Sequence, residues 1–309
     1  MIFILAVISL FIGYSPVTIQ KILAFDHDSL FIMWQTRIPR TFALILSGMA
    51  LALSGVIMQM LTRNRFVEPS TVGTMESAGL GLLFIMLFMP SLSIIAKTAI
   101  ASLFAMAGSC LFMFLVRRIP VKSVLMVPLT GIMLGYVIGS MTYFIGDQTN
   151  LLPSLQNYLF SSFSMVIKGN YELLWLSVIL IIIAYFIADR FTVAGLGEAF
   201  TQNLGLNYKS VMFTGLLIIS IITALIVCTV GRIPFVGLVV PNIISLFMGD
   251  NIRKTGPYIA LMGAGLVLLC DMIGRVINPA SEIPVGTMMG IIGSIIFLAF
   301  LLKGRKRYG

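Results

Sequence analysis

The sequence predicts an all-α integral membrane protein with about ten transmembrane helices. Of its 309 residues, 59% are hydrophobic and only 10% are charged, and the mean hydropathy is +1.07. Soluble domains carry about 25% charged residues. The chain also contains ten uncharged apolar runs, and a helix needs about 20 such residues to cross the hydrocarbon core of a bilayer. Together these observations predict a single transmembrane domain over residues 1–309.

The ten apolar runs follow one another with no soluble domain between them. Three runs (173–188, 233–249 and 255–270) are short, so flanking residues must complete their helices. The run 233–249 also contains Pro234 and Pro241, which predicts a broken or re-entrant span. The predicted spans are 1–20, 41–62, 77–96, 98–116, 123–146, 173–188, 210–231, 233–249, 255–270 and 283–302.

Basic residues orient this set of spans. With the N-terminus inside, thirteen of the 20 lysines and arginines fall on the inner side and seven on the outer side. Because cytoplasmic loops carry an excess of Lys and Arg, both termini are predicted to be cytoplasmic. Residues 1–20 lack the basic region and cleavage site of a signal peptide, so we expect a retained first span.

The cytoplasmic loop 189–209 is a polar exception in this apolar chain. It holds two acidic and two basic residues, and its middle predicts one short amphipathic helix that stops near Gly205. A short helix with one apolar face favours the docking of a soluble partner. A surface connector that binds nothing is the alternative. The apolar face carries Leu196, Ala199, Phe200 and Leu204.

Glycines recur at helical spacing in two predicted spans. Gly131, Gly135 and Gly139 follow every fourth residue in the fifth span, and Gly286 and Gly290 do so in the tenth. Small residues allow two helix backbones to approach closely. These stripes therefore indicate internal helix packing, or else the wall of a pathway or a subunit interface.

Few charged residues fall within the predicted spans. Asp271 precedes Arg275 by four residues, so the two side chains can pair on one helix face. Glu76 lies at the inner start of the third span, where we expect it to reach water. Ion-coupled carriers usually keep ionisable residues near the middle of the membrane. Their scarcity here indicates another energy source.

Several function classes lack their motifs in this chain. No G-x-x-x-x-G-K-[ST] segment occurs, so the chain does not bind ATP by a P-loop. One histidine, His27, and three cysteines inside apolar runs favour neither a metal site nor a hydrolase. The net charge of +9 includes no basic run outside loops and the tail, which argues against nucleic acid binding. We expect no catalytic residues, metal site or cofactor.

Three blocks carry a family resemblance. Residues 37–73 read RIPRTFALILSGMALALSGVIMQMLTRNRFVEPSTVG, and residues 195–207 read GLGEAFTQNLGLN. Residues 234–244 read PFVGLVVPNII, and DMIGR at 271–275 and EIPVG at 282–286 follow them. These blocks resemble the permease subunits of ABC importers for iron-siderophores, haem and vitamin B12, the iron-chelate permease family. The resemblance covers essentially the whole chain.

The resemblance implies a vitamin B12 importer permease-like fold in the bacterial cytoplasmic membrane. Two ten-helix subunits, identical or paralogous, enclose a pathway in that family. Two cytoplasmic ABC ATPase subunits drive transport, and an extracytoplasmic binding protein (a lipoprotein or a periplasmic protein) delivers the ferric siderophore. The loop 189–209 matches the family's coupling loop, which fits into the ATPase. The family's G-E-x-A-x-x-L-G pattern falls, with one extra residue before the leucine, on Gly197, Glu198, Ala199, Leu204 and Gly205.

The resemblance also implies roles for three arginines. Arg37, Arg40 and Arg275 match family arginines that face carboxylates of the binding protein. We expect them exposed at the outer mouth, where arginine pairs bidentately with carboxylates and steers a partner. Interfacial anchoring is the alternative. The glycine stripes of the fifth and tenth spans are implied to line the pathway or meet the second subunit.

Two departures from the familiar family pattern indicate its catecholate-siderophore branch. Asn242 stands where many relatives carry histidine, and Arg65 stands where small or apolar residues are common. The Thr74-Met75-Glu76 segment points to the same branch. The sequence thus predicts an ABC importer permease that moves a ferric siderophore inward. An ion-coupled secondary transporter is the alternative.

Overall fold

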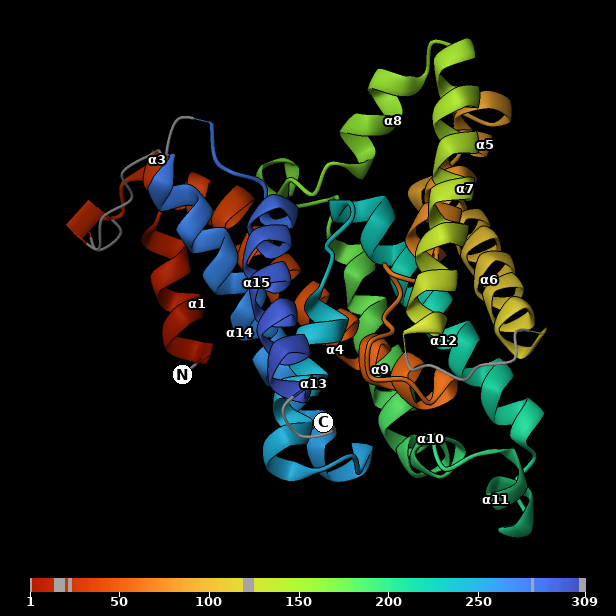
Figure 1. Ribbon diagram of the computed structural model, residues 1–309. Helices are drawn as coiled ribbons and strands as arrows, with labels where there is room; N and C mark the ends of the chain where they lie inside the picture. The colour runs from red at the N-terminus through yellow and green to blue at the C-terminus, as the bar shows by residue number, and fades with distance from the viewer. Residues whose placement is uncertain (1, 14–19, 22–23, 119–124, 279–280, 306–309) are drawn as a thin grey trace.

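The computed structural model describes residues 2–13, 20–21, 24–118, 125–278 and 281–305. These residues form helices and connecting loops, with no strand among them (Figure 1). Parts of several sequence predictions lie outside the described residues: 14–19 of the first span, 123–124 of the fifth span, and Lys122, Lys306 and Arg307 of the charge count.

Ten described helices overlap the ten predicted spans one to one. They are α1 (Ile2–Phe11), α4 (Ile38–Thr62), α5 (Thr74–Phe88), α6 (Ile94–Arg118), α7 (Met126–Gln148), α9 (Trp175–Phe186), α12 (Tyr208–Val230), α13 (Val236–Met248), α14 (Ile252–Ile277) and α15 (Val285–Arg305). The shorter elements are α3 (His27–Ile32), the π-helix η1 (Met33–Arg37), α8 (Leu152–Leu159), the 3-10 helices η2 (Phe163–Met165) and η3 (Glu172–Leu174), α10 (Ala188–Ala194) and α11 (Glu198–Asn203).

The helices differ in how far they could reach across a membrane. By length and composition, five described helices could cross one: the continuous helix His27–Thr62, α6, α7, α12 and α14. The segment Glu172–Phe186 is bent by 61° from α10, and this pair forms a sixth candidate. The remaining apolar helices, α1, α5, α13 and α15, are shorter. The predicted break or re-entrant turn in the run 233–249 stays a prediction: α13 has only 13 residues, but it continues through Pro241 as one helix.

Helix α4 forms the centre of the bundle, and most of its residues are buried. Glycines let two neighbouring helices approach its backbone. A Cβ on Gly48 would lie 2.5 Å from the carbonyl oxygen of Gly263 in α14. A Cβ on Gly55 would lie 2.0 Å from the carbonyl oxygen of Gly237 in α13. Because only glycine fits at such contacts, these pairs fix how α13 and α14 pack on α4.

Helix α5 begins inside the bundle rather than at its edge. The loop after α4 turns back, and a Cβ on Gly73 would lie 3.3 Å from the Cα of Gly135, near the middle of α7. Gly73 has a φ of +80°, which places the turn directly before α5. The 15-residue α5 then runs from this internal position toward the end of the bundle where α8 lies (Figure 1).

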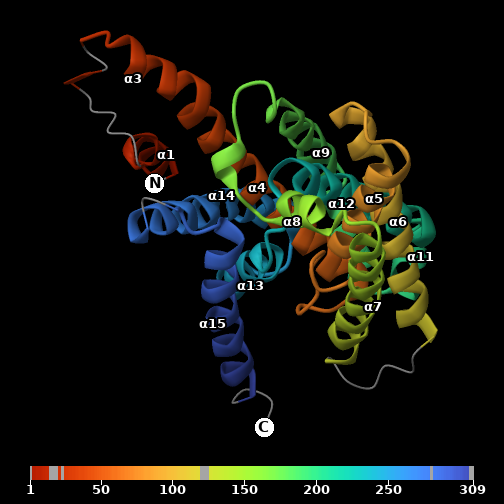
Figure 2. The ribbon, with the colours of Figure 1, turned by 90° about the horizontal axis from the view of Figure 1, so that it is seen from above.

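Helices α7 and α15 lie at the periphery and project on the same side of the bundle (Figure 2). The outer face of α7 is apolar and open, with Met133, Val137 and Phe144 about 60% exposed or more. Such a face suits lipid or another apolar helix. This side of the molecule also carries the cavity described below.

Candidate functional site

The predicted coupling loop consists of two short helices, α10 and α11, at the end of the bundle opposite α3 and α8 (Figure 1). α11 begins after Gly197, with a φ of +116°, and is followed by Gly205, with a φ of +76°. The hydroxyl of Thr201 is buried and donates to the carbonyl oxygen of Gly197 at 2.6 Å. The short helix and its glycine stop are therefore confirmed.

The apolar side chains of this segment are bare. Leu196, Phe200 and Leu204 are 60%, 48% and 56% exposed, and Glu198 and Ala199 are exposed beside them. Clustered exposed apolar groups at the polar end of a membrane bundle are typical of a protein docking surface.

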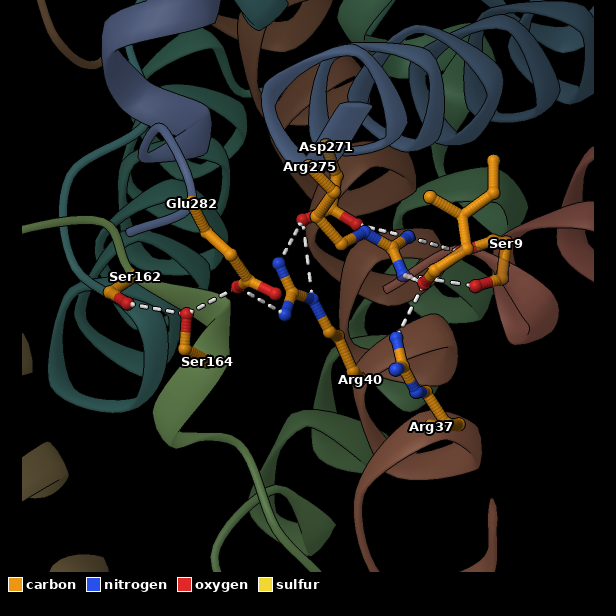
Figure 3. Close-up of polar contacts among 9 residues, drawn as sticks. Ser9, Arg37, Arg40, Ser162, Ser164, Asp271, Arg275 and Glu282 are labelled. Carbon is orange, nitrogen blue, oxygen red and sulfur yellow. Dashed lines mark hydrogen bonds and ion pairs between the residues drawn. The ribbon is translucent and has the colours of Figure 1, made fainter. Parts of the chain in front are cut away.

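At the opposite end, an ion-pair network joins α4, α14 and the loop before α15 (Figure 3). A terminal nitrogen of Arg40 lies 2.7 Å from Asp271 Oδ1, and the other lies 2.7 Å from Glu282 Oε2. The second oxygen of Asp271 lies 2.5 Å from Arg275, so the predicted pairing of these two residues is confirmed. The hydroxyl of Ser164 donates to Glu282 at 2.7 Å.

The same network holds the end of α1. Arg275 donates to the carbonyl oxygens of Ser9 and Ile12 at 3.0 and 2.6 Å, and to the hydroxyl of Ser9 at 2.6 Å. Arg37 also donates to the carbonyl oxygen of Ile12. The last carbonyls of a helix need such donors. These contacts tie α1 to α4 and α14.

The expectation that Arg37, Arg40 and Arg275 are exposed is wrong. Their exposed fractions are 8%, 8% and 2%. Carboxylates and helix-end carbonyls of the same chain take up their donors, which the sequence pattern does not show. Their docking role stays a prediction. Burial alone would raise the pKa of Glu282, but the Ser164 hydrogen bond and the Arg40 charge outweigh burial and lower it below the usual value.

The glycine stripes divide between two roles. Gly131 and Gly286 serve internal packing: a Cβ on Gly131 would lie 2.4 Å from the Thr71 carbonyl oxygen, and a Cβ on Gly286 would lie 1.9 Å from the Ser161 hydroxyl oxygen. Gly135 and Gly139 line a cavity, and a Cβ on Gly290 would meet nothing within 4 Å. Only the latter three are free to face a pathway or a second subunit.

The cavity, of about 810 Å³, lies between α5, α7, α13 and α15. Its wall includes Gly135, Tyr136, Gly139 and Tyr143 of α7 together with Glu76, Arg232 and Phe297. Glu76 and Arg232 face each other, with 3.8 Å between Oε1 and Nη1. The sequence analysis placed Glu76 at the inner start of the third span, where it reaches water, whereas Arg232 follows a span that ends on the outer side of the predicted topology, so this placement of the pair is wrong. Both line one cavity because α5 starts beside the middle of α7.

Glu68 has a structural role that the sequence analysis did not assign. It is 2% exposed and accepts the backbone N–H of Phe235 at 2.8 Å and the hydroxyl of Ser70. Phe235 has a φ of +68° and directly precedes α13, so Glu68 fixes the start of that helix. Burial raises the pKa of Glu68 to about 7, although these hydrogen bonds oppose the shift. An acidic residue beside Pro69, between Val67 and Ser70 in the loop after the second span, was the available signal.

Comparison with protein families identifies the chain. The sequence model of the FecCD transport family matches residues 1–303. The chain belongs to the FecCD transport family. This result confirms the family expected from the three sequence blocks, and it establishes a multi-pass membrane transport protein.

Relatives of this FecCD protein align along nearly their full length. The petrobactin import system permease protein YclN of Bacillus subtilis is 44% identical, covering 99% of this chain and 96% of the relative. The ferric-anguibactin transport system permease protein FatD of Vibrio anguillarum is 39% identical, covering 98% and 97%. The vitamin B12 import system permease protein BtuC of Citrobacter koseri is 31% identical, covering 89% and 84%.

A solved structure confirms the predicted fold of the FecCD chain. An inward-facing metal-chelate type ABC transporter matches with a TM-score of 0.80 and 27% identity, covering 98% of this chain and 96% of the other.

The two departures that indicated the catecholate branch, Asn242 and Arg65, also contact each other in the structure. The side-chain amide of Asn242 donates to the backbone oxygen of Arg65 at 2.8 Å.

Proposed function

We propose that this FecCD chain is the permease subunit of a bacterial ABC importer that carries a ferric siderophore of the catecholate type into the cytoplasm. The observation that carries the proposal is the family match over residues 1–303. The names of the petrobactin and anguibactin permeases support a siderophore as cargo. The chain itself hydrolyses nothing in this scheme, and separate ATPase subunits supply the energy.

The ATPase subunits dock on α11 and its flanking residues, where the side chains of Leu196, Phe200 and Leu204 are exposed. Closure of the ATPases moves α10 and α11, and through them the bundle. The start of α1 and the end of α15 lie toward the same end of the bundle as α11, which supports cytoplasmic termini (Figure 1). The binding protein approaches the opposite end, near the Arg40 network. Docking through Arg37, Arg40 and Arg275 requires the binding protein to displace their partners within the chain, since these side chains are buried.

The second permease subunit, a copy or a paralogue, packs on the side where α7 and α15 project (Figure 2). The open groups there are the apolar face of α7 and Gly290. The cavity beside Gly135 and Gly139 then becomes part of a pathway between two subunits. Small residues leave room there for a bulky chelate.

Transport into proteoliposomes tests the proposal. The vesicles contain this chain, its partner permease and the ATPase, with binding protein outside and ferric siderophore labelled with radioactive iron. Uptake that requires both ATP inside and the binding protein outside is expected. Uptake driven by a proton gradient alone would overturn the proposal in favour of an ion-coupled secondary transporter, with Glu76 as a candidate proton carrier.

A further inference from the structure

The cavity contains a charge pair that transport by itself does not explain. Arg232 and Glu76 lie 3.8 Å apart at their nearest nitrogen and oxygen atoms, with side chains 30% and 20% exposed. Nε of Arg232 and Oε2 of Glu76 are buried and have no hydrogen-bond partner among the described residues. Both side chains therefore keep unused hydrogen-bonding capacity at the cavity wall.

This pair is loose compared with the buried ion pairs that Arg40 and Arg275 form in the same protein. Charge-assisted N–H···O hydrogen bonds are about 2.7–2.9 Å long, and Arg40 and Asp271 meet that standard at 2.7 Å. A buried guanidinium without acceptors is costly. The 3.8 Å gap thus leaves Arg232 close enough to Glu76 for partial neutralisation and free to accept a second anionic partner.

The backbone around Arg232 is fixed, and Nη2 of its side chain lies beside Gly79 of α5, where an added Cβ would be 2.6 Å away. The backbone N–H of Arg232 donates to the Leu159 carbonyl oxygen at 3.1 Å. Its own carbonyl oxygen packs against Gly286, where an added Cβ would lie at 2.8 Å. On the facing helix, Gly139 leaves space in front of Glu76, because a Cβ there would lie 3.9 Å from Glu76 Cγ.

Aromatic side chains surround this space. Tyr136 and Tyr143 line the cavity and are 75% and 57% exposed. Aromatic faces stack on planar ligands such as catechol rings, and phenol groups donate hydrogen bonds to anionic oxygens. The guanidinium of Arg232, these two phenol groups and the space left by the glycines of α7 together suit a bulky anion with aromatic ligands.

We propose that Arg232 recognises the anionic oxygens of ferric chelates in the pathway, and that Glu76 is the internal competitor that lets them go. This inference rests on the proposed function. Chelates with catecholate or carboxylate ligands carry net negative charge, whereas ferric tris-hydroxamates are neutral. Arg232 turns from Glu76 to the chelate on entry and returns to Glu76 on exit. Binding stays weak, as transport requires, because tight binding would retain the cargo.

The test measures chelate binding to the purified importer, reconstituted without binding protein, using a ferric tris-catecholate and a neutral ferric tris-hydroxamate. Arg232→Gln is expected to weaken tris-catecholate binding about tenfold, the loss of one charge-assisted hydrogen bond. Glu76→Gln is expected to strengthen it and to slow ATP-driven uptake. Tris-hydroxamate binding is expected to stay unchanged in both variants. Arg118→Gln, an exposed arginine beside Phe114, is the matched control.

Arg232→Gln and Glu76→Gln are expected to change tris-catecholate binding in opposite directions, and this difference separates recognition from a structural role. A purely structural pair predicts that both variants lose binding of both chelates together with basal ATPase activity, and that result would overturn the inference. Arg232→Lys keeps the charge and is expected to restore part of the tris-catecholate binding even where the glutamine variant folds poorly. Unchanged tris-catecholate binding by Arg232→Gln in a working importer refutes this inference alone. Absence of any ATP-dependent uptake by the wild type refutes the proposed function as well.

Discussion

Arg40 and Asp271 form a buried ion pair at 2.7 Å across the contact between α4 and α14, although 231 residues separate them in the chain. Asp271 also pairs with Arg275, and Arg40 also pairs with Glu282. One carboxylate therefore serves two buried guanidinium groups. Because Arg275 holds the end of α1, the network joins the first, second and ninth apolar helices and the start of the tenth. This end of the subunit acts as one electrostatic unit.

Replacing Asp271 with alanine should destabilise the permease strongly. The change leaves Arg275 buried without its carboxylate and removes one of the two carboxylates of Arg40, and breaking a buried pair costs about 3–5 kcal/mol. Asp189→Ala is the matched control, because its pair with Arg253 is more than half exposed and solvent screens such pairs, so a much smaller loss is expected. Thermal unfolding of the purified complex in detergent measures both. Equal shifts in the two variants would contradict the structural role of Asp271.

Gly286 and Gly290 of α15 should respond differently to the same substitution. Gly286→Ala places a methyl group 1.9 Å from the Ser161 hydroxyl oxygen and 2.8 Å from the Arg232 carbonyl oxygen, so overpacking of about 1–3 kcal/mol is expected. Gly290→Ala meets nothing within 4 Å in the chain and should change its stability by less than about 0.5 kcal/mol. Unfolding of the isolated subunit checks this contrast. If Gly290→Ala instead impairs assembly with the partner permease, that position lies in the subunit contact.

The positions of the helices could be predicted from the sequence because span formation is local. The composition of each apolar run is enough to favour a membrane helix there, and each of the ten predicted runs overlaps one helix of the structure. The α11 segment was equally predictable, since its glycines and its apolar spacing lie within a dozen residues. Pairing of Asp271 with Arg275 also followed from spacing on one helix.

Contacts between distant segments could not be predicted in this way. The burial of Arg40 depends on Asp271 and Glu282, which come from the other end of the chain. The meeting of Glu76 and Arg232 depends on the loop 63–73, which returns into the bundle and starts α5 beside the middle of α7. A count of apolar residues assumes that every span starts at a membrane face, and α5 does not.

Gly205 should tolerate asparagine and reject valine. Its φ is +76°, a conformation that β-branched residues adopt only with strain, whereas asparagine adopts it readily. A Cβ there would meet nothing within 4 Å in the chain, so any effect comes from the backbone turn after α11 or from the docked ATPase. We expect the importer with Gly205→Val to hydrolyse ATP with little siderophore uptake. The importer with Gly205→Asn should keep ATP hydrolysis coupled to uptake. Comparison of uptake per ATP in proteoliposomes decides this, and normal coupling in Gly205→Val would remove the coupling role of the turn.

Glu68 should make the stability of the permease depend on pH in a defined direction. Burial raises its pKa from 4.5 to about 7, so between these values the folded state binds more protons than the unfolded state. The stabilisation linked to this proton is fully present below about pH 4.5 and is lost as the pH rises through about 7.

Glu68→Gln keeps an acceptor for the N–H of Phe235 but does not titrate. The wild type should therefore lose about 2 kcal/mol relative to Glu68→Gln between about pH 5 and about pH 8. Denaturant unfolding of both proteins across this range measures the difference, in which the other titrating groups cancel. Parallel pH profiles would show that Glu68 does not titrate in this range, and a difference of opposite sign would show that its hydrogen bonds with Phe235 and Ser70 outweigh burial.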